Sequence, residues 1–376
     1  MKYVGCFRIH FTILGIAGIW MPRSFENNVR LKFYYSVYRI FFLTLFLVGI
    51  IYTQFRFFIL VIGDIEKTVD SSVLFFTILP HIIKIYTLIS CRERIIRLLD
   101  IIERIPDKNN ILQMFSKNVA LISSAYFCTC IGTAILWCVY PFMKPVLTLP
   151  FYYPYISQES FLFPVLYVYQ TFGIIINALT IASEDFLAGG LMALAAAQLE
   201  LLCCDLSTIG ENKENINGNV DQYYEKIVTC IKFHVKIISF VEELSTIYGL
   251  SVFGQFLFSG ILLCESAFII ITSDVFTESV TMFLYLLCLL GQLLLYCFCG
   301  NMIKTNSEKV AAAAYSSRWE RTSLATQKAL LFLIMRSQMT LTVTPGGIFD
   351  LSLVTFSAVL KSSYSFLAVL NQKHDS

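Results

Sequence analysis

Seven apolar segments, each long enough to cross a bilayer as a helix, constrain the fold of this 376-residue chain more than any other feature. A transmembrane helix needs about 20 predominantly apolar residues. Only 14% of the residues are charged, against about 25% in an ordinary soluble domain. The sequence therefore predicts an all-α membrane protein with seven transmembrane helices. The apolar segments are residues 40–62, 69–90, 119–142, 161–190, 245–272, 279–300 and 348–370.

Lys and Arg residues are divided unequally between the two sides of the predicted membrane domain. Of the 28, 22 precede the first span or lie in the second, fourth and sixth connections, and four lie on the opposite side. Because basic loops remain in the cytoplasm, this predicts a cytoplasmic N-terminus and an extracellular C-terminus. G-protein-coupled receptors have the reverse orientation, and the third span lacks their Asp-Arg-Tyr sequence. A net charge of +2 gives no indication of nucleic-acid binding.

The twelve cysteines and four histidines do not suggest a disulfide framework or a metal site. Most cysteines lie inside apolar runs, where they are expected to act as small packing residues. The histidines are scattered, so we expect no zinc centre and no cofactor. No phosphate-binding loop, zinc-protease or hydrolase motif is present, which argues against an enzyme. A transporter is also disfavoured, because its usual paired halves are not evident.

The N-terminal apolar stretch superficially resembles a signal peptide. It ends in Ile19-Trp20-Met21-Pro22 instead of small residues suited to cleavage. We therefore expect a short interfacial helix with Trp20 at the depth of the lipid headgroups.

The residues after position 296 form a distinctive series of short motifs. They are Cys299-Gly300-Asn301, Tyr315-Ser316-Ser317-Arg318-Trp319, Phe349-Asp350-Leu351-Ser352-Leu353 and Leu360-Lys361-Ser362-Ser363-Tyr364-Ser365. This series resembles the C-terminal signature of insect odorant receptors, and the segment Gly15 to Pro22 is similar to the N-terminus of that family. Gustatory receptors are the nearest alternative, and these residues fit them less well.

The resemblance implies an odorant-gated, non-selective cation channel that binds small neutral volatile molecules in a transmembrane pocket and opens a tetrameric pore. It also implies assembly with odorant co-receptor subunits in the plasma membrane, in contact with lipid and permeating cations, at the dendrite of an olfactory sensory neuron. The family's co-receptor has a much longer connection between its fourth and fifth spans. The short connection here resembles that of a ligand-tuned subunit.

Three regions follow from this interpretation. Residues 1–300 are expected to form a six-helix transmembrane domain with the ligand pocket in its extracellular half. Residues 301–338 are expected to form a cytoplasmic anchor helix for assembly, and residues 348–376 a pore-lining last helix with a short tail. The expected anchor contacts are Tyr315, Trp319 and Leu331.

The last span is expected to present one face to the pore, as the resemblance implies. Leu360, Ser363, Tyr364, Leu367 and Asn371 fall near that face at helical spacing. Four copies of Leu367 around an axis would close a pore by excluding water. The alternative is that Leu367 packs against a neighbouring helix or faces lipid. Lys361 is expected off this face, and Asp350 is a weaker candidate for attracting cations.

Candidate ligand-binding residues combine large apolar side chains with a few hydroxyl or amide groups, as a small apolar ligand requires. Segments 71–80, 125–142, 160–183 and 279–300 contain no charged residue, which favours neutral ligands. For each residue the alternative is ordinary helix packing. The loop 144–159, rich in proline and aromatic residues, is expected to cover the pocket. The candidates are Val73, Phe76, Thr133, Trp137, Tyr140, Tyr169, Gln170, Gly173, Met282, Phe283 and Tyr285.

Overall fold

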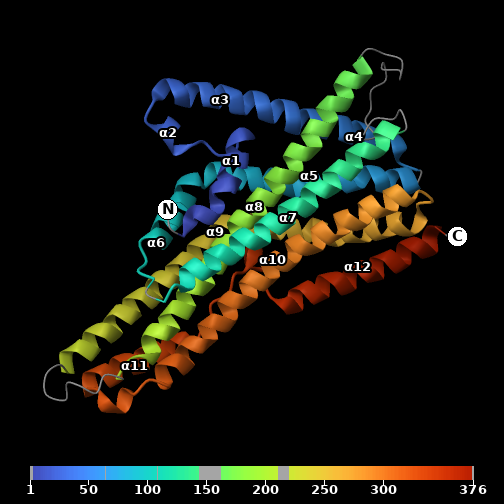
Figure 1. Cartoon of the computed structure of the whole chain (residues 1–376). Helices are drawn as coiled ribbons and strands as arrows, with labels where there is room; N and C mark the ends of the chain where they lie inside the picture. Colours follow the sequence, from blue (N-terminus) through green and yellow to red (C-terminus); the bar gives the residue numbers. More distant parts are fainter. Residues whose placement is uncertain (1–2, 64, 108, 144–161, 211–219, 375–376) are drawn as a thin grey trace.

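The computed structural model describes residues 3–63, 65–107, 109–143, 162–210 and 220–374. Within these ranges the chain forms helices and no strands (Figure 1). The α-helices are α1 (Arg8–Ile16), α2 (Arg23–Glu26), α3 (Val29–Leu43), α4 (Gly49–Val61), α5 (Ile65–Ser90), α6 (Arg92–Glu103), α7 (Ile111–Met143), α8 (Leu162–Ser207), α9 (Val220–Thr272), α10 (Phe276–Tyr315), α11 (Leu324–Ser337) and α12 (Leu353–His374). Short helical turns are η1 (Val4–Phe7), η2 (Thr44–Val48), η3 (Trp319–Arg321) and η4 (Pro345–Gly347).

Seven helical segments of the described chain are long and apolar enough to cross a membrane. The first joins α3 to α4 through the π-helical turn η2, and the others are α5, α7, α8, α9, α10 and α12. The predicted all-α fold with seven membrane helices is therefore confirmed.

Several helices extend well beyond the predicted apolar segments. α8, α9 and α10 contain 46, 53 and 40 residues. At about 1.5 Å per residue they are roughly 60–80 Å long, about twice the bilayer core. The predicted boundary at residue 300 falls inside α10, so the expected anchor comprises the end of α10, η3 and α11.

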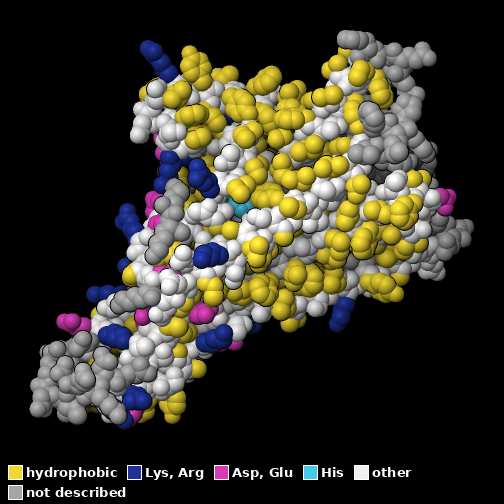
Figure 2. Space-filling model, in the orientation of Figure 1, with side chains coloured by type: hydrophobic (Ala, Val, Ile, Leu, Met, Phe, Trp, Pro, Cys, Tyr) yellow, Lys and Arg dark blue, Asp and Glu magenta, His cyan; other side chains and the backbone are white. Residues whose placement is uncertain are grey.

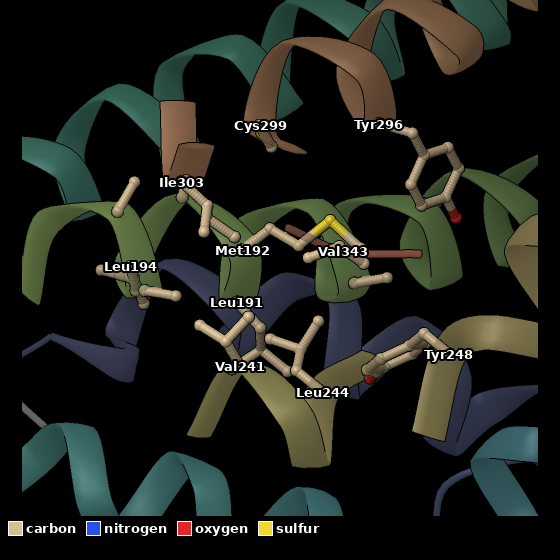
Figure 3. Close-up of a cluster of buried hydrophobic side chains, with 14 of the residues drawn as sticks. Leu191, Met192, Leu194, Val241, Leu244, Tyr248, Tyr296, Cys299, Ile303 and Val343 are labelled. Carbon is tan, nitrogen blue, oxygen red and sulfur yellow. The ribbon is translucent and has the colours of Figure 1, made fainter. Parts of the chain in front are cut away.

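Helix α8 forms the centre of the bundle. Every residue from 182 to 199 is buried, and small residues let its neighbours approach closely. A Cβ atom on Gly190 would lie 2.5 Å from the ring of Phe7. Figure 3 shows Leu191 and Met192 of α8 in the core, with Val241 of α9 and Ile303 of α10 among their neighbours.

The N-terminal segment packs into the protein instead of lying on its surface. Trp20 is only 6% exposed and stacks on Phe11 with ring centroids 4.9 Å apart. The Trp20 ring is thus enclosed by protein, and its depth at the lipid headgroups stays a prediction. His10 is buried beside Phe127 and Phe186. Burial lowers the pKa of His10 to about 4, so it is neutral at physiological pH.

The two ends of the bundle differ in charge. In Figure 2, Lys and Arg side chains gather at the left and lower left, toward the end where Figure 1 places α11. Hydrophobic side chains cover most of the remaining visible face. The N- and C-termini lie on opposite sides of the molecule in Figure 1, and α12 lies at its periphery.

Candidate functional site

A cavity of about 130 Å³ lies inside the helical bundle, between α4, α5, α7, α8, α9 and α10. A cavity of about 150 Å³ can hold benzene, so this one has room for a small organic molecule. Its wall is mostly apolar with a few polar groups, as is usual for small-molecule sites. The lining residues are Ile50, Gln54, Leu74, Thr77, Ile78, Pro80, His81, Lys84, Tyr126, Cys130, Thr133, Ala134, Trp137, Ile174, Asn177, Ala178, Ile181, Gln255, Leu262, Tyr285, Cys288, Leu289 and Gln292.

The lining residues recur at helical spacing. On α5 they include Leu74, Ile78, His81 and Lys84, which are separated by three or four residues and therefore share one face. The same spacing recurs on α7 and α10. Each helix thus contributes one face to the wall and packs with the others through the rest of its surface.

Three of the predicted ligand residues, Thr133, Trp137 and Tyr285, line the cavity. The Trp137 and Tyr285 rings meet edge-on with centroids 5.7 Å apart. The Tyr285 hydroxyl lies 2.5 Å from the Thr77 hydroxyl, and the Thr133 hydroxyl donates to the Thr129 carbonyl. This part of the wall presents aromatic surface whose hydroxyl groups are already paired.

At the end of the cavity away from Trp137 and Tyr285, charged side chains form a network. His81 and Lys84 of this network line the cavity. Lys84 Nζ donates to Asp185 Oδ1 at 2.5 Å and to Gln255 Oε1 at 2.7 Å. His81 Nδ1 lies 2.8 Å from Glu184 Oε2. All of these residues are at least 96% buried. A charge so far from water requires a partner, and Lys84 has the Asp185 carboxylate beside it.

Two more groups extend this network to α10. The Tyr296 hydroxyl donates to Asp185 Oδ1 at 2.6 Å. Gln255 Nε2 donates to Gln292 Oε1 at 3.1 Å. The network therefore connects α5, α8, α9 and α10 through one chain of polar contacts.

Seven other predicted ligand residues lie outside the lining of this cavity. Phe76 stacks on Phe258, and Tyr169 donates to the Leu45 carbonyl where α8 meets the first span. Gly173 allows α8 to approach α4, because a Cβ there would lie 2.8 Å from the Ile50 side chain. Phe283 is half exposed. The remaining three are Val73, Gln170 and Met282, all buried.

Two predictions concern parts of the chain that the structure does not describe. They are the role of the Tyr140 side chain in ligand binding and the loop 144–159 as a cover over the pocket.

Sequence reasoning missed much of the polar part of the wall, which includes Gln54, His81, Lys84, Asn177, Gln255 and Gln292. One signal was available: ionisable residues inside apolar spans are costly and usually functional. Lys84 on the second span and Glu184-Asp185 on the fourth carry opposite charges. Those residue types indicate an ion pair.

The predicted pore residues occupy different sides of α12 in the single chain. Leu360 and Leu367 are partly buried against the core, and Ser363 is buried and donates to the Val359 carbonyl. Tyr364 is 75% exposed, and Asn371 is half-buried.

The predicted anchor residues lie near one another at the junction of α10 and η3 and on α11. Tyr315 and Leu331 are exposed. Trp319 is partly buried, with its ring centroid 6.4 Å from that of Tyr315. In the described part of the chain no group of three or more His, Cys, Asp or Glu residues is placed to hold a metal ion.

A seven-helix bundle around a mostly apolar cavity defines a multi-pass membrane protein that binds a small molecule. Residues 64–364 match the family model described as 7tm Odorant receptor, and the chain belongs to this family. It is therefore an odorant-binding receptor and not an enzyme.

Known proteins similar to this chain agree with the family assignment. Odorant receptor Or1 of Anopheles gambiae is 25% identical over 97% of this chain and 94% of its own length. Odorant receptor 30a of Drosophila melanogaster is 30% identical over 40% of each chain. The insect olfactory receptor OR5 from Machilis hrabei, solved in complex with eugenol, has a TM-score of 0.86 at 17% identity, covering 99% of this chain and 100% of its own. These findings confirm the predicted resemblance to insect odorant receptors.

Proposed function

We propose that this receptor is the ligand-tuned subunit of a tetrameric, odorant-gated, non-selective cation channel that assembles with odorant co-receptor subunits. The observation that carries the proposal is the cavity inside the bundle, since two of the helices that line it, α9 and α10, also contact α12. Its N-terminus is cytoplasmic, because the basic residues gather on that side of the membrane domain. By family resemblance it acts at the plasma membrane of the olfactory neuron dendrite.

The ligand is a small neutral molecule. Two side chains of the wall, His81 and Lys84, already have Glu184 and Asp185 as hydrogen-bond partners. A charged ligand would have to leave water without a free counter-charge in the wall, which is strongly unfavourable. A cavity of about 130 Å³ with mostly apolar residues accommodates a volatile molecule of modest size.

Ligand binding is linked to α12 through α9 and α10. Gln255 lines the cavity, and the next residue, Phe256, contacts Phe349 with ring centroids 5.2 Å apart. Phe349 precedes α12 by four residues. On α10, Gly300 lies directly against Leu351. A ligand that alters the position of α9 or α10 therefore acts on the segment that leads into α12.

Two exposed apolar surfaces support assembly. On α12, Val354, Tyr364 and Phe366 are 66–78% exposed. On α11, Leu331, Phe332 and Met335 are 57–71% exposed. Contiguous apolar surface outside the bilayer is typical of protein interfaces, so we assign the α11 surface, with Tyr315 and Trp319, to subunit contacts. The anchor is thus the region 301–338.

The function is tested by whole-cell current in cells that express this chain with the co-receptor, each alone, or neither. A panel of neutral volatile molecules should evoke cation current in cells that contain both proteins, with the G-protein inhibitor GDPβS in the pipette. Ala178→Phe, which fills part of the cavity, should reduce the response of every active odorant. Responses that disappear with GDPβS would show a metabotropic receptor and overturn the proposal.

Orientation is tested separately with epitope tags. A tag after Ser376 should be labelled on intact cells, and a tag before Met1 only after permeabilisation. The opposite labelling would contradict both the orientation and the cytoplasmic anchor.

A further inference from the structure

Gln54 on α4 is a buried amide in the wall of the ligand cavity. It is 0% exposed. Within the described residues, neither its Nε2 nor its Oε1 has a hydrogen-bond partner. Burying an amide without partners is unfavourable, so such a group in a native protein requires an explanation.

The residues around Gln54 do not supply the missing partner. Gln54 shares a face of α4 with Ile50, one turn away, and Ile50 packs with the apolar residues Leu74, Ile78 and Ile174. The hydroxyl groups of Thr77 and Tyr285, also in the wall, are hydrogen-bonded to each other. The amide of Gln54 therefore lies beside apolar side chains and obtains no partner from this hydroxyl pair.

Gln54 and the charged network lie at different ends of the cavity. Along α5 the lining runs from Leu74 to Lys84, which is roughly 15 Å at about 1.5 Å per residue. Helices α4 and α5 are consecutive and antiparallel, so the end of α4 lies beside the start of α5. Gln54 is one turn nearer the end of α4 than Ile50, and it therefore lies toward Leu74 and away from Lys84. A ligand that fills the cavity between these two ends meets the unpaired amide of Gln54 at one of them.

We propose that the odorant of this receptor carries a hydroxyl group that binds the amide of Gln54. The amide offers a donor at Nε2 and an acceptor at Oε1, and a single hydroxyl can accept from the first and donate to the second. An ether, ketone or ester oxygen can only accept, and a hydrocarbon can do neither. The ligand class is therefore a neutral alcohol with an apolar body, and this assignment rests on the proposed function.

The same chemistry predicts selectivity. A site built to bond a hydroxyl discriminates strongly against an analogue without it, because the buried group of the site is then left unpaired. Within a set of molecules of equal size and shape, the alcohol is therefore the most potent.

The test uses sets of three ligands with the same skeleton and about the same number of heavy atoms: an alcohol, an ether and a hydrocarbon. One set is 1-octanol, 1-methoxyheptane and nonane, and branched and cyclic sets accompany it. Dose–response curves are measured in cells with the co-receptor. In wild type we expect the alcohol to have an EC50 about tenfold or more below that of its ether.

Gln54→Leu should raise the EC50 of alcohols about tenfold and change those of ethers and hydrocarbons about twofold or less. Ile50→Val is the matched control, because it alters the same face of α4 without changing a polar group. It should shift all members of a set by the same factor. Surface labelling of each variant separates loss of recognition from loss of expression, and the wild-type ranking decides the question if Gln54→Leu does not reach the surface.

Equal potency of alcohol and hydrocarbon in wild type would overturn the role of Gln54 and leave the channel function intact. An equal shift of all three ligands in Gln54→Leu would also overturn it. If no ligand of any set evokes current, the inference fails together with the proposed function.

Discussion

Trp137 is the tryptophan of the cavity wall, and its ring meets Tyr285 edge-on. Trp137→Ala removes many dispersion contacts with any ligand and enlarges the cavity. We expect the EC50 of small odorants to rise about tenfold, the equivalent of about 1.4 kcal/mol, and larger odorants to lose less. The ranking of odorants in dose–response curves, as well as the maximal current for some of them, should therefore change.

Tyr169→Ala provides the comparison for Trp137. Tyr169 packs on Phe46 outside the cavity lining, so its loss should shift the curves of all odorants by a similar factor. A change of ranking as large as that of Trp137→Ala would show that Tyr169 touches the ligand, as the sequence analysis predicts.

Lys84 is the second residue whose substitution has a defined consequence. Lys84→Met leaves Asp185 with a buried, unbalanced charge, which typically costs about 3–5 kcal/mol. We expect a large loss of thermal stability in detergent, measured by size-exclusion chromatography after heating. Lys84→Met with Asp185→Asn should recover most of it. Lys361→Met, which removes an exposed lysine, is the control and should have little effect.

The site was predictable from sequence where residue type alone carries the signal. Trp137 and Tyr285 belong to uncharged apolar segments, and such segments with aromatic and hydroxyl groups indicate a pocket for a neutral ligand. The sequence indicates an ion pair between the second and fourth spans but not which acidic residue pairs with Lys84, because Asp185 lies 101 residues away and pairing depends on how the two helices are rotated. The position of Gln54 in the cavity wall was not predictable for the same reason. The first span is apolar on nearly all sides, so its sequence does not indicate which face points inward.

At the scale of helices, Gly300 marks the contact between α10 and the segment before α12. A Cβ atom there would overlap the Leu351 side chain and lie 2.8 Å from its carbonyl oxygen. Because backbone cannot yield as a side chain can, Gly300→Ala should displace this segment and cost about 1–3 kcal/mol. We expect altered basal current or efficacy, measured by whole-cell recording, with ranking of odorants preserved.

Gly132→Ala is the control for Gly300. Apart from the neighbouring backbone of α7, no atom lies within 4 Å of a Cβ added to Gly132. Alanine is also a better helix former than glycine. It should leave stability and current close to wild type. A Gly300→Ala receptor that behaves in the same way would show that the close approach of α10 to Leu351 has no role in gating.

The number and order of the membrane helices were predictable because each bilayer crossing requires its own apolar run. The ends of α8, α9 and α10 were not, since a helix keeps its backbone hydrogen bonds after it leaves the membrane while its hydropathy falls. The packing of Trp20 against protein was not predicted for a related reason. An aromatic residue at the end of an apolar stretch suits both a membrane interface and a protein core, and only the packing of α1 on α8 decides between them.

At the scale of the whole receptor, α12 is the least buried of the seven candidate membrane spans. Only 6% of its apolar window is buried within the chain. An exposed helix of this kind suits contact with other subunits around a pore. In the proposed channel, odorant binding must bias an equilibrium between closed and open assemblies. A shift from 1:99 to 99:1 requires about 5.5 kcal/mol of differential binding energy. A ligand of about ten heavy atoms provides at most a few to about 10 kcal/mol in total, so the closed state must be only slightly favoured or several subunits must bind ligand.

Leu367→Ala tests this balance at the proposed gate. Within one chain Leu367 is partly buried against the core, so its contribution to the pore depends on how α12 is arranged in the assembly. A ring of alanines is wider and less apolar than a ring of leucines and excludes water less readily. Because the weaker ring destabilises the closed state, we expect a leak current without odorant and a lower EC50 for every odorant. Val369→Ala, on the exposed side of α12, is the comparison. If the leak appears in Val369→Ala and is absent from a well-expressed Leu367→Ala receptor, the exposed side of α12 faces the pore and Leu367 serves only to pack α12 on the bundle.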